Sequence, residues 1–299
     1  MKTPLPQIIA IMGTTASGKT ALSLDIAEKY NGEIICLDSR TMYRGMDIGT
    51  AKPSNAEQTR APHHLIDIAD PDKSISLGEV KIMTEKIISE IISRNHLPIL
   101  VGGTAFYMYA ILENWLIPEI EPDVNLRAEL ETLSTNQLIE RLNQLDPTAI
   151  NLIDIQNRRR IIRAIEIVSK TEKPLSNNRA KGLRKFDALK IALNRNESFL
   201  RSSIAQRTEK MIADGLIEEV KTLLTKYTPS LPSMNAIHYK EVVDFLNGVY
   251  KLEEMVNLIN THDWQLTRRQ LTWLKRDNEI SWIDDPNQAD ILIKKYLSQ

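Results

Sequence analysis

The sequence predicts an α/β fold in which helices flank a parallel sheet. Three observations predict it: a Gly-rich turn between an apolar run and a helical pattern near 7–30, alternating strand and helix patterns over the first ~115 residues, and an all-helical pattern from about 116 to 183. Strands that alternate with helices form parallel sheets with right-handed crossovers. We therefore expect a P-loop NTPase-like parallel sheet core with an all-helical insertion domain and C-terminal helices.

The first part of the core is expected to alternate between strands and helices. The apolar run 8–12 predicts the first strand, and isoleucines at helical spacing give helix 76–94 a core-facing stripe. The strands expected here are 7–12, 33–38 and 98–101, and the helices are 18–30, 76–94 and 104–113. Loops that follow parallel strands gather at one edge of the sheet. This should bring together the segments 13–20, Asp38-Ser39 and Gly102-Gly103-Thr104.

Strand signals stop after about residue 116, where prolines at 118 and 122 mark the change. Short amphipathic helices are expected at 124–133, 136–145, 147–154 and 157–170. We therefore assign residues 118–183 to the insertion domain, and residues 1–117 with 184–299 to the core. A strand near 184–194 is expected to rejoin the sheet, and long helices at about 198–226 and 251–276 complete the fold.

The Gly-rich turn has the sequence GTTASGKT. Its glycines let successive backbone N–H groups point at a phosphate, and the helix start adds its dipole. Lys19 supplies a mobile positive charge and Thr20 a hydroxyl for Mg²⁺. A chance glycine turn would not account for the flanking strand and helix. We therefore predict binding of a di- or triphosphate by Gly13, Thr14, Thr15, Ala16, Ser17, Gly18, Lys19 and Thr20, with the metal at Thr20.

Two further loops at the same edge carry candidate catalytic residues. Asp38 and Ser39 end the second strand, where a carboxylate can take the proton of an acceptor nucleophile. A Mg²⁺-associated aspartate or a helix cap fits the position of Asp38 equally well. The Gly102-Gly103-Thr104 segment permits close backbone approach to a ligand and can aim a hydroxyl into the crevice. A plain helix start capped by Thr104 is the alternative.

Two clusters of positive charge lie on a chain whose net charge is −1. Arg159 and Arg163 are four residues apart and share one face of a predicted helix, whose other face carries Ile161. The second cluster is interleaved with two tryptophans and comprises Arg268, Arg269, Lys275 and Arg276. Such clusters can contact a phosphate backbone, although charged runs are more often solvated surface.

Composition points to an ordinary globular protein of the cytoplasm. The single cysteine, Cys36, lies in an apolar run, which fits a buried, reduced side chain. The longest apolar stretch, about 99–112, is too short to cross a bilayer, and the N-terminus lacks the pattern of a signal peptide. We therefore expect no membrane partner.

Five ordered segments resemble the motifs of one family, the tRNA dimethylallyltransferases (tRNA isopentenyltransferases, the IPP transferase family). They are DSRTMYRGMDIGTAKP at 38–53, HHLIDIADPDKSIS at 63–76, LPILVGGT at 97–104, RRRIIRAIEI at 158–167 and RRQLTW at 268–273. The resemblance covers residues 8 to 284. The chain departs from the family pattern at Thr14, where the family usually has proline, at Ala105, at 154–157, and at His238, which replaces the glycine of a Gly-Tyr-Lys/Arg motif.

This resemblance implies transfer of a dimethylallyl group from dimethylallyl diphosphate to the exocyclic amine of the adenosine 3′-adjacent to the anticodon. The tRNAs would be those reading codons that start with U, and the product isopentenyladenosine. The Gly-rich loop would hold the diphosphate rather than ATP, with Mg²⁺ as cofactor beside Thr20. Asp38 would be the general base, Thr15 and Thr104 would line the reaction channel, and Arg207 would support the leaving diphosphate.

The resemblance also implies that both domains grip the tRNA anticodon stem-loop. The residues involved would be Asp38, Ser39, Arg40, Thr41, Thr104, Arg127, Arg159, Arg160, Ile161, Ile162, Arg163, His238, Tyr239, Lys240, Gln265, Arg268, Arg269 and Gln270. The adenine must leave its stack to reach the channel, which single-stranded loops permit. We expect a monomer, because RNA binding by two domains of one chain needs no symmetry.

Three other functions stay open from the residues alone. A small-molecule kinase would use the Gly-rich loop for ATP, and Asp38 would bind the acceptor hydroxyl. A non-catalytic RNA-binding protein would use a nucleotide for regulation. A prenyltransferase of free adenine nucleotides would need neither the long insertion nor the second basic cluster. The long insertion and the second basic cluster favour tRNA prenylation.

Overall fold

The computed structural model describes residues 4–118, 120–176 and 180–298. The chain forms two compact units. Residues 1–112 and 185–299 form the first, called the core unit here, and residues 113–184 form the second, called the insertion unit. In the described part of the chain, no helix is both long enough and apolar enough to cross a membrane.

The core unit is built on a parallel sheet. Its strands are β1 (Gln7–Met12), β2 (Gly32–Cys36), β3 (His63–His64), β4 (Leu97–Gly102), β5 (Asp187–Leu193) and β6 (Ser281–Ile283). The described residues pair in the order β3-β2-β4-β1-β5-β6, with every ladder parallel. This confirms the predicted P-loop NTPase-like sheet.

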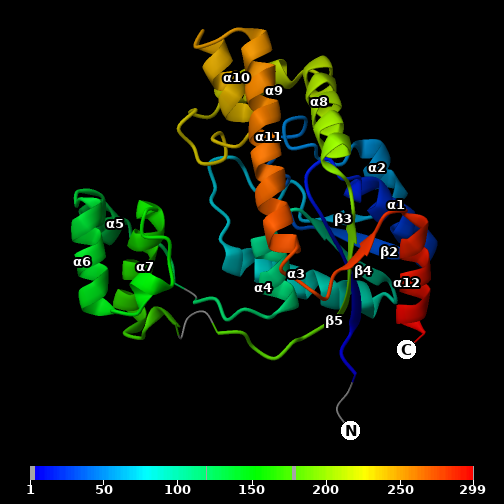
Figure 1. The fold of residues 1–299 in the computed structure, drawn as a ribbon, viewed down its shortest axis with the longest axis horizontal. Coiled ribbons are helices and arrows are strands. Elements are labelled where there is room, and N and C mark those ends of the chain that lie inside the picture. Colours follow the sequence, from blue (N-terminus) through cyan, green and yellow to red (C-terminus); the bar gives the residue numbers. More distant parts are fainter. Residues whose placement is uncertain (1–3, 119, 177–179, 299) are drawn as a thin grey trace. The chain divides into compact units, whose positions relative to one another are not determined.

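Helices follow most of these strands, as a parallel sheet requires (Figure 1). Those described in the core unit are α1 (Lys19–Tyr30), α2 (Asn55–Arg60), α3 (Leu77–Ser93), α4 (Ala105–Leu112), α8 (Glu197–Ala213), α9 (Leu216–Leu224), α10 (Tyr239–Leu246), α11 (Leu252–Leu274) and α12 (Asn287–Leu297). Those described in the insertion unit are α5 (Val124–Glu131), α6 (Thr135–Leu145) and α7 (Arg158–Thr171).

Strand β1 lies in the middle of the sheet and of the core. Ile8, Ile9 and Ile11 are fully buried although they face both sides of the sheet, as expected where helices cover both faces. Met12 pairs in register with Gly102, so β1 and β4 end at the same level. The loops that follow these two strands therefore start side by side at the carboxyl edge of the sheet.

The structure corrects two of the expected helices. The single helix expected at 198–226 is two helices, α8 and α9, because Gly215 adopts φ 102° and ψ 29°, a left-handed conformation that suits glycine. The helix expected at 147–154 is only a short 3-10 helix at Ala149–Asn151. The sequence patterns also miss α2, α10, α12 and β6, whose short lengths give few periodic positions.

The insertion unit packs around its own hydrophobic core and one buried carboxylate. Leu138, Leu142 and Ile165 are fully buried in that core. Glu166, on α7, is also fully buried and accepts hydrogen bonds from the backbone of Asp123 at 2.6 Å and from the guanidinium of Arg127 at 2.9 and 3.0 Å. Arg163 donates to the same carboxylate. Burial opposes ionisation of Glu166, but these bonds outweigh it and lower its pKa to about 2.

Glu166→Ala is expected to destabilise the insertion unit by about 3 kcal/mol, because it leaves the partly buried N–H of Asp123 and two guanidinium groups without their anion. Urea unfolding followed by circular dichroism measures the loss. The matched control is Glu129→Gln, since Glu129 is exposed and pairs with Arg141 at 2.5 Å, a kind of pair worth about 0–1 kcal/mol. Equal effects of the two substitutions would contradict a structural role for the buried carboxylate.

Candidate active site

A cavity of about 840 Å³ opens at the carboxyl edge of the sheet, within the core unit. Its lining includes the Gly-rich loop, the loop that begins at Asp38, the Gly102–Phe106 segment, residues 235–239, and parts of α8 and α11. In open parallel sheets ligands bind at this place, beyond the carboxyl ends of the strands. The cavity is therefore the candidate active site.

The Gly-rich loop forms a closed turn between β1 and α1. Gly18, which precedes α1, has φ 96° and ψ 14°, a conformation that glycine adopts without strain. Ser17 Oγ donates a hydrogen bond of 2.9 Å to the carbonyl of Thr14, and both residues are buried. A Cβ on Gly13 would come within 3.0 Å of Ser17 Oγ. The turn thus presents the N-terminus of α1 to the cavity, where its N–H groups and dipole attract an anion.

Lys19 is the cation of this loop. Its ammonium donates a hydrogen bond to the Thr14 carbonyl. Burial lowers the pKa of Lys19 to about 8, an effect that the charge of Asp38 opposes and that of Arg207 reinforces. Arg207 therefore lies close enough to repel Lys19, and an anion between these two cations would be stabilised by both.

Diphosphate binding is expected to require proton uptake above pH 8. The free Lys19 ammonium has a pKa of about 8, and a bound anion raises it, so affinity falls by up to tenfold per pH unit above that value. Isothermal titration calorimetry with inorganic diphosphate at pH 9, in buffers of different ionisation enthalpy, measures the number of protons taken up on binding. The wild type should take up about 0.9 proton more than Lys19→Arg, because the guanidinium of that variant is already charged at this pH. Equal uptake by both proteins would contradict this assignment.

Asp38 stands directly after β2, in the cavity wall. The backbone N–H of Leu37 donates to the carbonyl of Val101 at 2.8 Å, which extends the pairing of β2 with β4 up to this point. Asp38 Oδ1 accepts a hydrogen bond of 2.9 Å from the backbone N–H of Arg40. The carboxylate is therefore held in one orientation, half-buried, and suited to accept a proton from a group in the cavity.

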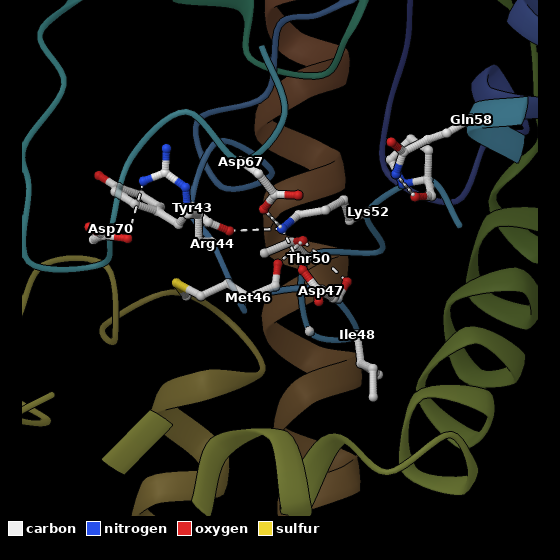
Figure 2. A network of polar contacts seen from close by, with 12 residues as sticks. Tyr43, Arg44, Met46, Asp47, Ile48, Thr50, Lys52, Gln58, Asp67 and Asp70 are labelled. Atoms are coloured by element: carbon white, nitrogen blue, oxygen red, sulfur yellow. Dashed lines mark hydrogen bonds and ion pairs between the residues drawn. The ribbon is translucent and has the colours of Figure 1, made fainter. Parts of the chain in front are cut away.

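The loop after Asp38 is fixed by a lysine and two aspartates (Figure 2). The ammonium of Lys52 donates to the carbonyl of Tyr43 at 2.8 Å and pairs with Asp47 and Asp67, each at 2.5 Å. The lysine side chain is only 4% exposed. This network ties residues 43–52 to the segment around Asp67 and so stabilises the loop that carries Asp38.

Gln270, on α11, connects two walls of the cavity. Its Oε1 accepts from the backbone N–H of Thr15 at 2.8 Å, and its Nε2 donates to the carbonyl of Gly103 at 3.1 Å. A Cβ on Gly103 would lie 2.5 Å from that Nε2, so a side chain at this position would displace the Gln270 amide. The amide thus connects the Gly-rich loop at Thr15 to Gly103, the residue before Thr104, and both threonines line the cavity.

Arg207, on α8, pairs with an aspartate that the sequence analysis does not identify. Its Nη2 donates to Asp263 Oδ2 at 2.8 Å, and Asp263 is 1% exposed. Burial raises the pKa of Asp263, but a hydrogen bond from His238 and the charge of Arg207 outweigh it and lower the pKa to about 2. The sequence did contain a signal for a buried aspartate. Asp263 falls at a four-residue interval with Met255, Ile259 and Thr267, which are buried along α11.

The donor set around Thr20 fits Mg²⁺ bound together with a diphosphate. Within the described ranges, no cluster of three or more His, Cys, Asp or Glu side chains could hold a metal by protein ligands alone. Mg²⁺ does not need such a cluster, because it commonly retains waters and binds through one or two protein oxygens plus substrate phosphates. Thr20, with Asp38 across the same cavity, offers such oxygens.

The cavity brings together only part of the expected tRNA surface. Its lining includes Asp38, Ser39, Arg40, Thr41, Thr104, His238, Tyr239, Arg269 and Gln270. Arg268 instead lines a second cavity of about 570 Å³, with Arg195 and Trp264. Gln265 is in neither lining, and Lys240 pairs with Asp244 at 2.9 Å. The expected residues Arg127, Arg159, Arg160 and Arg163 lie in the insertion unit.

Five residues expected to contact tRNA are buried: Thr41, Ile161, Ile162, His238 and Tyr239. Ile161 and Ile162, 0% and 4% exposed, belong to the hydrophobic core of the insertion unit. Tyr239 is fully buried and donates a hydrogen bond of 2.6 Å to Glu219, and burial raises its pKa. His238 is 5% exposed. Ile161 and Ile162 thus pack inside the insertion unit, whereas His238 and Tyr239 also line the cavity. Contact of these residues with tRNA stays a prediction.

Comparison with known proteins gives consistent matches along the chain. A model of the IPP transferase family matches residues 41–277. A protein of Roseiflexus sp. (strain RS-1), named tRNA dimethylallyltransferase, is 42% identical over 300 residues, with 97% of this chain and 98% of the relative covered. A protein of the same name from Prochlorococcus marinus (strain MIT 9312) is 38% identical over 295 residues, covering 98% of each chain.

Solved structures agree with these sequence matches. The full-length tRNA isopentenylpyrophosphate transferase of Bacillus halodurans aligns with a TM-score of 0.73 at 35% identity, over 99% of this chain and 96% of that chain. A eukaryotic dimethylallyltransferase acting on tRNA aligns with a TM-score of 0.87 at 25% identity, over 98% of this chain and 80% of that chain.

Proposed function

The chain belongs to the IPP transferase family, and from that premise we propose that it transfers a dimethylallyl group from dimethylallyl diphosphate to tRNA. The acceptor is the exocyclic amine of the adenosine 3′-adjacent to the anticodon, in tRNAs reading codons that start with U, and the products are isopentenyladenosine and diphosphate. One observation carries the proposal: a single cavity holds an anion-binding loop, a facing arginine and an oriented carboxylate.

The leaving group lies between the cations of the cavity. The bond between the allylic carbon and the diphosphate oxygen breaks, and its electron pair leaves with the diphosphate. Lys19, the N-terminus of α1 and Arg207 stabilise the charge that develops there. Mg²⁺, held at Thr20 when bound, neutralises further phosphate charge. The allylic carbon delocalises its own positive charge, which compensates for a weakly nucleophilic amine.

The acceptor enters from the side of Asp38. The exocyclic nitrogen forms a bond to the allylic carbon, and a proton from that nitrogen passes to the carboxylate of Asp38. Thr15 and Thr104 line the space between carboxylate and diphosphate and position the two reactants. The adenine reaches this space by flipping out of the anticodon loop.

The RNA backbone meets arginines of both units. Arg40 and Arg269 line the cavity. In the insertion unit Arg159 and Arg160 are exposed, and the side chains of Arg127 and Arg163 are 41% and 35% exposed. Phosphate contacts of this kind supply affinity without sequence preference. We further propose that the protein acts as a monomer in the cytoplasm, where the free, buried Cys36 stays reduced.

Four parallel reactions separate this function from the alternatives. The protein receives ATP with candidate metabolites, dimethylallyl diphosphate with free adenine nucleotides, dimethylallyl diphosphate with an anticodon stem-loop, or the stem-loop alone. The proposal expects a prenylated product only in the third reaction and RNA binding in the fourth. A phosphorylated metabolite would indicate a kinase, prenylated mononucleotides a nucleotide prenyltransferase, and binding without product a regulatory RNA-binding protein.

A further inference from the structure

His238 adopts a backbone conformation that side chains rarely tolerate. Its φ is 79° and its ψ is −43°, outside the ordinary helical and extended regions. The residue precedes α10 and is 5% exposed. Non-glycine residues persist in such conformations where the surrounding structure holds them, and such positions cluster at functional sites.

Two hydrogen bonds hold His238 in place. Its backbone N–H donates to the buried carboxylate of Glu241 at 2.7 Å, and its Nε2 lies 3.1 Å from Asp263 Oδ2. Because Asp263 has a pKa lowered to about 2, it is ionised at neutral pH, so Nε2 carries the proton and donates. The strained residue therefore delivers a proton donor to the aspartate that pairs with Arg207.

The contact between Asp263 and Arg207 is incomplete. A carboxylate and a guanidinium that meet freely form two parallel hydrogen bonds. Here only Arg207 Nη2 reaches the carboxylate, at 2.8 Å, and it reaches Oδ2, the oxygen that His238 also uses. Arg207 Nε and Asp263 Oδ1 are buried and have no hydrogen-bond partner among the described residues. All three residues line the cavity.

We propose that His238 is a positioning residue for Arg207: by holding Asp263 through Oδ2, it prevents a two-bond pair and keeps guanidinium N–H groups available to the leaving diphosphate. This inference rests on the proposed function for the identity of the anion. Arg207 and Lys19 line the same cavity, and the charge of Arg207 contributes to the lowered pKa of Lys19, so an anion beside Lys19 also lies near Arg207. Asp263 holds the positively charged Arg207 in the cavity wall through one hydrogen bond from Nη2, which leaves Nε unbonded to the carboxylate.

His238→Gly isolates this role. Glycine adopts φ 79° without strain, so the variant is expected to melt within a few degrees of the wild type. Asp263 can then turn and pair with Arg207 through both oxygens, and binding of inorganic diphosphate with Mg²⁺, measured by calorimetry, should weaken about tenfold. KM for dimethylallyl diphosphate should rise by a similar factor, while the Kd for an anticodon stem-loop stays unchanged.

Two more variants make the result specific. His238→Gln carries an amide donor close to the place of Nε2, and should recover most of the lost diphosphate affinity. His96→Gln is the matched control, because His96 also bonds a buried carboxylate, Glu33 at 2.7 Å, but precedes β4 at the amino edge of the sheet; its diphosphate affinity should equal that of the wild type.

Unchanged diphosphate affinity in His238→Gly would overturn the proposal, and so would equal losses in His238→Gly and His238→Gln. If His238→Gly fails to fold, His238→Gln is compared with the wild type instead. A tenfold lower affinity of folded His238→Gln for inorganic diphosphate would then contradict the positioning role. Failure of the proposed function is distinguishable, because the wild type would then form no prenylated RNA although diphosphate binding could still be compared among the variants.

Discussion

Asp38→Asn is expected to lower kcat for prenyl transfer by about 10²–10⁴-fold while leaving RNA affinity unchanged. Asparagine keeps the shape of the side chain and can still accept the hydrogen bond that the Arg40 backbone donates to Asp38 at 2.9 Å. It cannot take the proton of the exocyclic amine. Single-turnover reactions with labelled dimethylallyl diphosphate measure the chemical step, and filter binding measures the RNA affinity.

Asp70→Asn is the matched control for this loop. Asp70 is half-exposed and pairs with Arg44 at 3.2 Å, as Figure 2 shows, and it is not part of the cavity lining. Its replacement should change kcat by less than about twofold, since exposed ion pairs contribute little. Turnover of Asp38→Asn at the wild-type rate would eliminate the carboxylate as the general base.

Lys19→Met is expected to lower kcat/KM for dimethylallyl diphosphate by about 10²–10³-fold, the effect typical of removing one charge that stabilises a transition state. Methionine fills the space of the lysine stem but offers no positive charge to the diphosphate. Affinity for inorganic diphosphate, measured by calorimetry, should fall with it, whereas the melting temperature should be maintained or raised because a partly desolvated charge is removed.

Lys221→Met controls for the loss of a positive charge in general. Lys221 lies on α9, is half-exposed and pairs with Glu218 at 2.7 Å. It should leave both diphosphate affinity and kcat/KM unchanged. A normal diphosphate affinity in Lys19→Met would contradict the assignment of the Gly-rich loop as the anion site.

Local sequence signals predicted the parts of the fold that depend on local structure. The run from Ile8 to Met12 followed by a Gly-rich turn specifies β1 and the start of α1, since a buried strand and a tight turn each need particular residue types over a few positions. The break at Gly215 was not predicted, because a single glycine is compatible with a helical pattern. Only the structure shows its left-handed φ of 102°.

The candidate site was predictable in its loops and not in its helices. Lys19, Asp38 and Thr104 lie in or at the end of the segments that follow β1, β2 and β4, so their shared edge follows from the parallel topology. The contact between Asp263 and Arg207 joins α11 to α8, and which faces of two helices meet depends on packing that one-dimensional periodicity does not encode. For the same reason Ile161 and Ile162, although adjacent to arginines in sequence, lie in the core of the insertion unit.

Nucleoside mass spectrometry of a modified stem-loop tests the central claim most directly. The protein, Mg²⁺ and dimethylallyl diphosphate are incubated with an anticodon stem-loop carrying adenosine 3′ of the anticodon, and with a stem-loop in which that adenosine is replaced by guanosine. We expect one dimethylallyl group on the adenosine of the first RNA and none on the second. An unmodified first RNA, or equal modification of both, would contradict the assignment of this cavity to prenyl transfer onto that base.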